Sequence, residues 1–196
     1  KVVHMEIGGG FGGKRPIYLD PVAALLSKKS GRPVQVVMSR ADGFEGSGPT
    51  SGTYITIKLG AKNGKLTAAK ATLAYEAGAF PGSPVGAGSM TMLAPYNLEN
   101  FEINAYDVVV NKPKVAAYRA PGSPAAAFAA ESAMDELIHK IGADPLQFRL
   151  DNASHEGTRM VTGQPFPKVG NEECVRAAIA SPHWQSPIKG PYRGQI

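Results

Sequence analysis

The stretch TYITIKLGAKNGKLTAAKATLAY, residues 53–75, decides the fold class of this chain of 196 residues. Residues 53–59 alternate apolar and polar side chains, which is the period of a strand with one buried face. The Asn-Gly dipeptide within Lys62-Asn63-Gly64-Lys65 favours a tight connection between antiparallel strands. Residues 66–75 have the composition of the returning strand. We therefore predict a β-hairpin here.

Strand character is also present on both sides of this hairpin, in residues 2–7, 34–38 and 102–110. Residues 78–95 are rich in Gly, Pro and Ser, and they predict a long irregular region, which in a compact chain is more often functional than idle. Because the strands cluster instead of alternating with helices, the predicted class is α+β, with a mixed, mainly antiparallel sheet and packed helices.

Helix starts are marked by one repeated device, an N-cap oxygen followed by proline at the first helical position. It occurs at Asp20-Pro21, Ser123-Pro124 and Asp144-Pro145. Gln147, three residues after Asp144, completes a pattern like a capping box. The predicted helices run from these starts to near residues 31, 142 and 153, and a fourth is predicted around residues 171–180.

Composition and charge argue against several classes of protein. The net charge is +5, but the basic residues are scattered with no stripe interleaved with aromatics, so we expect no nucleic-acid partner. No apolar stretch approaches the length of a membrane span, and we expect no membrane association. The single cysteine, Cys174, excludes an internal disulfide framework and leaves the cytoplasm as the default compartment. Because the sequence opens at Lys1 inside a strand-like run, we expect a segment of a longer polypeptide.

The glycine loop, GGGFGGK at residues 8–14, follows the first strand-like segment. Its glycines leave only Phe11 with a β-carbon before Lys14, so the backbone can approach a ligand closely. The spacing also fits a phosphate loop, which would make this a nucleotide-binding module. That motif needs Ser or Thr after the lysine to hold Mg²⁺, and this chain has Arg15 there. A glycine-rich turn without a ligand is the third interpretation.

The arginine segment, AAYRAPGSP at residues 116–124, leads from the predicted sheet into the alanine-rich helix. Arg119 precedes a Pro-Gly turn beside a helix N-terminus. This places a guanidinium, free amides and the positive end of a helix dipole together, a combination that suits an anionic ligand. A loop arginine is often solvated or salt-bridged instead. Alone, the segment leaves its role open.

Together, four stretches resemble the molybdenum-cofactor-binding subunit of the molybdenum hydroxylases, the xanthine dehydrogenase and aldehyde oxidase family. They occur in the family's order, with GGGFGGK at 8–14, KSGRPVQVVMSR at 29–40, AYRAPGSP at 117–124 and GADPLQFRLDNA at 142–153. The resemblance implies the fold of the family's molybdenum-cofactor-binding domain. Residues 1–196 would be a fragment of that molybdopterin-binding domain, with a sub-boundary near residues 111–124.

The resemblance also implies which residues bind the cofactor. The backbone of Phe11 and Gly12 would lie beside the metal and the pterin, and the main chain of Arg119 would approach the molybdenum. Neither loop provides a side-chain ligand, because the dithiolene sulfurs of the pterin hold the metal, and no catalytic side chain is assigned in this segment. The implied cofactor-binding residues are Gly10, Phe11, Gly12, Gly13, Ala117, Arg119 and Ala120.

The family's reaction, as the resemblance implies it, is hydroxylation of a C–H carbon of an aldehyde or a (hetero)aromatic compound, with water as oxygen donor and a glutamate as base. The cofactor would be molybdenum–molybdopterin in its dinucleotide form, with iron–sulfur clusters and FAD on other domains or subunits. The glutamate and much of the cofactor site lie outside this segment. We therefore expect it to be inactive and free of cofactor alone, and to work with the remainder of the large subunit and the iron–sulfur and flavin subunits. The alternative is a non-catalytic relative that acts in assembly.

Two departures bear on the substrate pocket. Purine-oxidising members carry an acidic residue just after the glycine-loop lysine and a phenylalanine that stacks on the purine. This chain has Arg15 and Pro121 at these positions. The resemblance therefore implies a small organic substrate other than xanthine.

Overall fold

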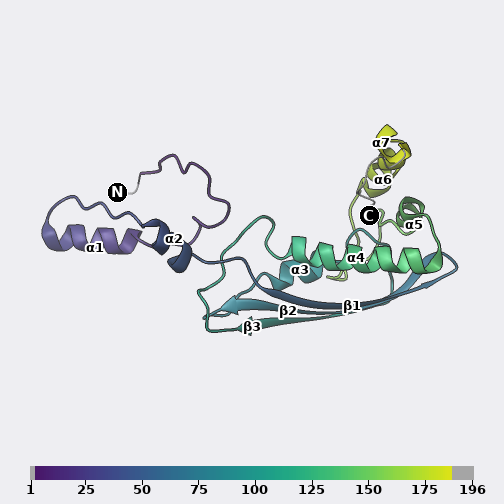
Figure 1. Cartoon of the computed structure of the whole chain (residues 1–196), viewed down its shortest axis with the longest axis horizontal. Helices are drawn as coiled ribbons and strands as arrows, with labels where there is room; N and C mark the ends of the chain where they lie inside the picture. The colour runs from purple at the N-terminus through teal and green to yellow at the C-terminus, as the bar shows by residue number, and fades with distance from the viewer. Residues whose placement is uncertain (1–2, 187–196) are drawn as a thin grey trace, which may run out of the picture.

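The computed structural model describes residues 3–186, and its centre is a three-stranded sheet (Figure 1). The strands are β1 (Thr53–Lys62), β2 (Lys65–Gly78) and β3 (Phe101–Val109), in the order β1-β2-β3. β1 and β2 are antiparallel, while β2 and β3 are parallel. The sheet is therefore mixed, as predicted.

The hairpin of β1 and β2 turns at Asn63 and Gly64. Both residues have positive φ, 52° and 76°, the conformation that a tight two-residue connection requires and that Asn and Gly adopt most readily. The predicted hairpin is confirmed. Its strands extend beyond the alternating pattern, because pairing continues to Lys62 and Lys65 at the turn.

The parallel pairing of β2 with β3 requires a crossover, since parallel strands cannot be joined by a tight turn. The crossover contains α3 (Val85–Thr91), whereas the sequence predicts an irregular region over residues 78–95. For the residues of α3 that prediction is wrong. Glycines such as Gly86 and Gly88 have low helix propensity, but the helix lies against β2 and β3, and this packing overrides the local preference.

α4 (Ser123–Ile141) lies along the same face of the sheet as α3 (Figure 1). Its buried residues recur every four positions and form one stripe, made of Ala126, Ala130, Met134 and Ile138. The stripe belongs to the same hydrophobic core as Leu73 and Tyr75 of β2. The two alanines let the helix approach the sheet closely, and the strand that α4 lies against is β1.

A partly buried ionic network joins α4 to α5 (Pro145–Asp151). The Arg149 guanidinium donates to Glu131 at 2.8 Å and to Asp135 at 2.7 Å. The Tyr96 hydroxyl donates to the same Glu131 carboxylate at 2.8 Å. Burial raises the pKa of Tyr96, helped by the negative charge of Glu131, so the hydroxyl stays protonated and donates. The network fixes the middle of α4.

Two short helices follow α5 at the end of the sheet that lies away from α1 and α2 (Figure 1). α6 (Asn171–Ile179) confirms the fourth predicted helix, and α7 (Pro182–Gln185) is not predicted from the sequence. Over residues 3–186, no helix combines the length and the apolar character needed to cross a membrane.

The N-terminal arm, residues 3–52, stands off the opposite end of the sheet and carries α1 (Asp20–Ser30) and α2 (Arg40–Gly46) (Figure 1). Neither helix has a buried residue. The strands predicted at 2–7 and 34–38 are wrong, since residues 3–7 and 34–38 form no strand; residue 2 lies outside the described range. A strand needs a neighbour for its N–H and C=O groups, and no described strand pairs with either segment.

The helix starts agree with the predictions only in part. Asp144 caps α5, because its carboxylate accepts a hydrogen bond from the Gln147 N–H at 2.7 Å. Asp20 and Ser123 are instead the first residues of α1 and α4, and neither side chain caps its helix. The predicted capping role of these two residues is therefore wrong. The Ser123 hydroxyl accepts from Thr91 of α3 at 3.0 Å and so joins two helices instead.

A complete capping box opens α2, which the sequence pattern does not predict. The Ser39 hydroxyl accepts from the Asp42 N–H at 3.1 Å, and the Asp42 carboxylate accepts from the Ser39 N–H at 3.0 Å. The bonds from Ser39 hold the pKa of Asp42 below its usual value. The available signal was the Ser-x-x-Asp spacing, in which Asp takes the place of the usual Glu or Gln.

Met134→Ala is expected to lower the free energy of unfolding by about 2–5 kcal/mol, because it leaves a cavity in the packed core. Met134 is fully buried, whereas Phe128 on the same helix is 78% exposed. Phe128→Ala is therefore the control, and it should change this free energy by less than about 0.5 kcal/mol. Urea unfolding followed by circular dichroism measures both variants, and equal effects would contradict the buried stripe.

Candidate functional site

The glycine loop forms turns ahead of α1. The Gly13 N–H donates to the Gly10 carbonyl at 2.9 Å. A β-carbon at Gly8 or Gly10 would meet no atom within 4 Å, so the backbone is open on that side. Phe11 is 81% exposed and has a φ of 50°, in the left-handed region. The loop therefore presents bare backbone outside its own turns.

The arginine segment contains equally unusual backbone. Arg119 and Ala120 have φ values of 36° and 45°, which residues with a β-carbon rarely adopt. Among the described residues, four that are not glycine have positive φ, and three of these are Phe11, Arg119 and Ala120. The fourth is Asn63 in the hairpin turn. Strained backbone of this kind concentrates at functional sites.

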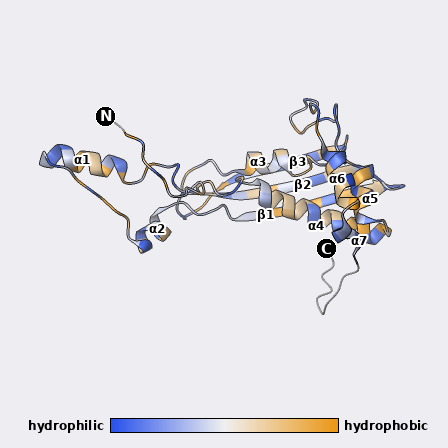
Figure 2. Ribbon diagram, turned by 90° about the horizontal axis from the view of Figure 1, so that it is seen from above, coloured by the Kyte–Doolittle hydropathy of each residue, from blue (hydrophilic) through white to orange (hydrophobic). Residues whose placement is uncertain are grey.

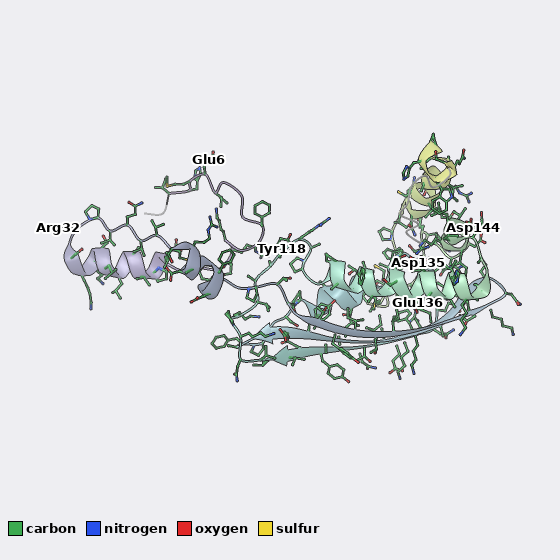
Figure 3. The ribbon with its side chains drawn as sticks, viewed as in Figure 1. Glu6, Arg32, Tyr118, Asp135, Glu136 and Asp144 are labelled. Carbon is green, nitrogen blue, oxygen red and sulfur yellow. The ribbon has the colours of Figure 1, made fainter. Side chains whose placement is uncertain are left out.

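The two segments touch, although they lie far apart in the sequence. A β-carbon on Gly12, whose φ is 86°, would lie 1.9 Å from the carbonyl oxygen of Ala117. Only glycine fits there. Figure 3 shows Tyr118, the neighbour of Ala117, at the junction between the N-terminal arm and the sheet. The two predicted groups of cofactor-binding residues therefore lie next to each other.

A second set of backbone contacts holds the arm to the stretch between β3 and α4. The Ala116 N–H donates to the Pro49 carbonyl at 2.9 Å. A β-carbon on Gly48 would lie 2.3 Å from the carbonyl oxygen of Lys114, so this contact also requires glycine. The Gly48 N–H donates to the Tyr18 hydroxyl at 3.1 Å. Residues shortly before α1 and just after α2 are thus both fixed beside the arginine segment.

Unpaired backbone donors collect where the two segments meet. Within residues 3–186, the N–H groups of residues 10–12 and 117–120 donate to no backbone carbonyl. Successive N–H groups on turn and left-handed backbone form concave sites for anionic and oxygen-rich ligands. The junction is therefore suited to a polar ligand that is held by the main chain.

A cavity of about 290 Å³ opens beside the arginine segment. Arg119 and Pro121 line it, together with Tyr118 and Tyr75. Pro121, one predicted substrate-pocket residue, thus shares a cavity with a predicted cofactor-binding residue. Arg15, the other, follows the glycine loop and lies outside this lining.

Tyr75 is the member of this site that the sequence pattern does not single out. Its place near the end of β2 predicts an ordinary core residue, and it is indeed fully buried. Its hydroxyl donates to the Gly122 carbonyl in the arginine segment at 3.0 Å. A buried tyrosine needs a partner for its hydroxyl, and that requirement was the only available signal.

Residues 1–153 match the family described as the molybdopterin cofactor-binding domain. The chain belongs to this family. The nicotinate dehydrogenase large molybdopterin subunit of Eubacterium barkeri is 30% identical over 168 residues, which are 84% of this chain and 40% of that subunit. The xanthine dehydrogenase molybdenum-binding subunit of Escherichia coli O157:H7 is 30% identical over 191 residues, 94% of this chain and 25% of that subunit.

The fold of this molybdopterin cofactor-binding domain is similar to that of the aldehyde oxidoreductase from Desulfovibrio gigas. The TM-score is 0.82 at 27% identity, over 91% of this chain and 20% of that one. The predicted α+β fold of the family is therefore confirmed. The chain spans only 20–40% of the length of these three relatives.

The glycine loop of the molybdopterin cofactor-binding domain differs from a phosphate loop. The Lys14 ammonium donates to the Ile7 carbonyl instead of reaching across the loop. α1 begins only at Asp20, whereas a phosphate loop leads directly into its helix. Arg15 stands where the motif needs the hydroxyl that binds Mg²⁺. The geometry therefore does not favour a nucleoside triphosphate.

Gly12→Ala is expected to detach the glycine loop from the arginine segment, because the new methyl group would overlap the Ala117 carbonyl and alanine disfavours a φ of 86°. Trypsin should then cleave after Lys14 about fivefold faster or more. Gly13→Ala is the control, since a β-carbon there would lie 3.7 Å from the Gly10 oxygen, an ordinary contact. The same cleavage rate in both variants would contradict the contact.

Proposed function

We propose that the chain supplies two backbone loops of the molybdenum–pterin site of an oxidoreductase. The enzyme would hydroxylate a C–H carbon of an aldehyde or a (hetero)aromatic compound, with water as the oxygen donor. The observation that carries the proposal is the contact of Gly12 with Ala117, where N–H groups of both loops donate to no backbone carbonyl within residues 3–186. Membership of the molybdopterin cofactor-binding domain family supports the same cofactor.

The residues at the junction fit a bulky, oxygen-rich group that has no side-chain ligands. A ligand can lie against Gly8 and Gly10, because β-carbons there would meet nothing within 4 Å. The N–H groups of residues 10–12 and 117–120, which find no backbone acceptor in the described part of the chain, can donate to it. In the proposal, the backbones of Phe11, Gly12 and Arg119 lie nearest the molybdenum, and those of Gly10, Gly13, Ala117 and Ala120 border the pterin.

The protein's task at this site is to orient the cofactor. When bound, the cofactor supplies the two-electron oxidation of the substrate carbon. The left-handed backbone at Phe11, Arg119 and Ala120 is flanked by the close contacts of Gly12 with Ala117 and of Gly122 with Pro84. The donors are therefore placed before the ligand arrives, and little ordering remains to oppose binding. The proposal places the catalytic glutamate elsewhere in the subunit and assigns no base within this chain.

The adjoining cavity supports a small substrate. About 290 Å³ is at the lower end of the range for small-molecule sites, and Tyr118 and Pro121 line it. Pro121 has no aromatic ring to stack on a purine, and Arg15 replaces an acidic side chain. The names of the relatives include a nicotinate dehydrogenase, a xanthine dehydrogenase and an aldehyde oxidoreductase. We favour an aldehyde or a small (hetero)aromatic compound over xanthine.

The chain would work within a larger assembly. We propose that the rest of a large subunit, iron–sulfur clusters and FAD on other domains or subunits, and the dinucleotide form of the cofactor complete the enzyme in the cytoplasm. Exposed apolar residues in the middle of α1 support packing against that remainder (Figure 2), since Val22, Leu25 and Leu26 are all exposed. Alone, the chain would be inactive, because the base and much of the cofactor site lie outside it.

Two other functions make different demands on the same residues. A nucleotide-binding module would need Lys14 free for phosphates, and Lys14 is bound to the Ile7 carbonyl. A non-catalytic relative that acts in assembly would keep this fold and lack the cofactor. The cofactor content of the whole protein separates this last function from the proposed one.

The full-length protein that carries this chain is expected to contain about one molybdenum and one pterin per subunit. Metal analysis and pterin fluorescence after release measure the two components. A protein without either would overturn the proposal. Binding of ATP with Mg²⁺ in a calorimeter would support the nucleotide-binding module instead.

Gly10→Ala should reduce the molybdenum content of that protein several-fold without changing its thermal unfolding. The added methyl group has space within the chain, but it would project from backbone that we place against the pterin. Gly43→Ala in α2 is the matched control, because a β-carbon there also meets nothing within 4 Å. Equal molybdenum content in the two variants would contradict the assignment of Gly10.

A further inference from the structure

Tyr75 connects the sheet to the arginine segment. Its side chain has 0% exposure, and its hydroxyl donates to the Gly122 carbonyl at 3.0 Å. Burial raises the pKa of Tyr75, so the hydroxyl remains a neutral donor. Gly122 therefore has a fixed position relative to β2.

Gly88 of α3 leaves the space in which this hydrogen bond forms. A β-carbon at Gly88 would lie 2.8 Å from the Tyr75 hydroxyl oxygen and 3.2 Å from the Gly122 carbonyl oxygen. Gly122 also packs on Pro84, because a β-carbon at Gly122 would lie 2.2 Å from the Pro84 carbonyl oxygen. The end of β2, the helix α3 and the start of α4 thus converge on Gly122.

The left-handed pair Arg119 and Ala120 is held on both sides. On its N-terminal side, the glycine loop packs against Ala117. On its C-terminal side, Tyr75 holds Gly122. Left-handed backbone at residues with a β-carbon persists only where the surroundings over-determine it. The hydrogen bond from the Tyr75 hydroxyl is one of the contacts that hold this backbone.

We propose that Tyr75 is a positioning residue for the cofactor, which acts through Gly122 on the backbone of Arg119 and Ala120. Gly88 is the residue whose missing side chain makes this possible. The inference rests on the proposed function, because the backbone that Tyr75 holds is the backbone that we place beside the molybdenum. The hydroxyl determines how the N–H groups of Arg119 and Ala120 face the cofactor.

Tyr75→Phe in the full-length holoenzyme removes the hydroxyl and keeps the ring. We expect the cofactor to be released about fivefold faster in urea below the unfolding transition. We also expect a changed electron paramagnetic resonance signal of the molybdenum, which a loss of stability alone would not produce. Tyr54→Phe is the matched control, because Tyr54 is 69% exposed on β1, and this variant should match the wild type in both measurements.

Gly88→Ala is expected to release the cofactor faster than Tyr75→Phe, since the methyl group meets both the hydroxyl and the Gly122 carbonyl. Adding Tyr75→Phe to Gly88→Ala should restore part of the retention, because it removes the contact at 2.8 Å. Gly86→Ala in the same helix is the control, as a β-carbon there meets nothing within 4 Å. Release from the double variant at the product of the two single effects would show that the residues act independently, and the inference would fail.

Hydrogen exchange of the cofactor-free, full-length protein tests the same inference without molybdenum. The Ser123 N–H donates to the Ala120 carbonyl at 3.0 Å and closes the turn. Its exchange should be about fivefold faster in Tyr75→Phe. Unchanged exchange at Ser123 with an unchanged molybdenum signal would overturn the inference. Absence of molybdenum from the wild-type protein would instead overturn the proposed function, and the exchange at Ser123 would still decide whether Tyr75 holds the turn.

Discussion

At Gly12 and at Gly122, the polypeptide passes so close to another segment that a side-chain carbon has no space. Gly12 lies on the carbonyl of Ala117, and Gly122 lies on the carbonyl of Pro84. Between these two contacts, the chain takes the left-handed conformation at Arg119 that its residue type disfavours. Packing against other segments therefore sets the shape of the arginine segment, and local preference does not.

The sheet and α4 provide the support that these contacts need. α4 packs on the sheet through a stripe that contains Ala126 and Ala130 and lies against β1, and Arg149 holds the middle of the helix through two carboxylates. Because these contacts hold α4, its start, which continues directly from the arginine segment, has a fixed position. The site then needs no cysteine or histidine, because it offers N–H groups from the main chain. A ligand that brings its own metal ligands, as a molybdenum–pterin does, suits such a site.

Local sequence signals predicted much of this fold. The elements that were predicted wrongly depend on pairing or packing with distant segments. Alternation with the Asn-Gly turn predicted the hairpin, and Asp144 followed by proline predicted the start of α5, because each signal acts within a few residues. The apolar runs at 2–7 and 34–38 have the same character, but residues 3–7 and 34–38 form no strand, because no described strand supplies hydrogen bonds to them. α3 escaped prediction because its glycines are poor helix formers, and it is packing on the sheet that stabilises it.

The candidate site, like the fold, could be predicted from the sequence only in part. The residues alone identified the glycine loop and the arginine segment, since the conformational freedom of glycine and the order of motifs are properties of the chain itself. The folded molecule decided that Gly12 meets Ala117 and that the Tyr75 hydroxyl reaches Gly122. It also decided that N–H groups of both segments find no backbone acceptor among residues 3–186. These contacts join segments that are distant in sequence, and they exist only because the crossover through α3 and the packing of α4 bring those segments to one end of the sheet.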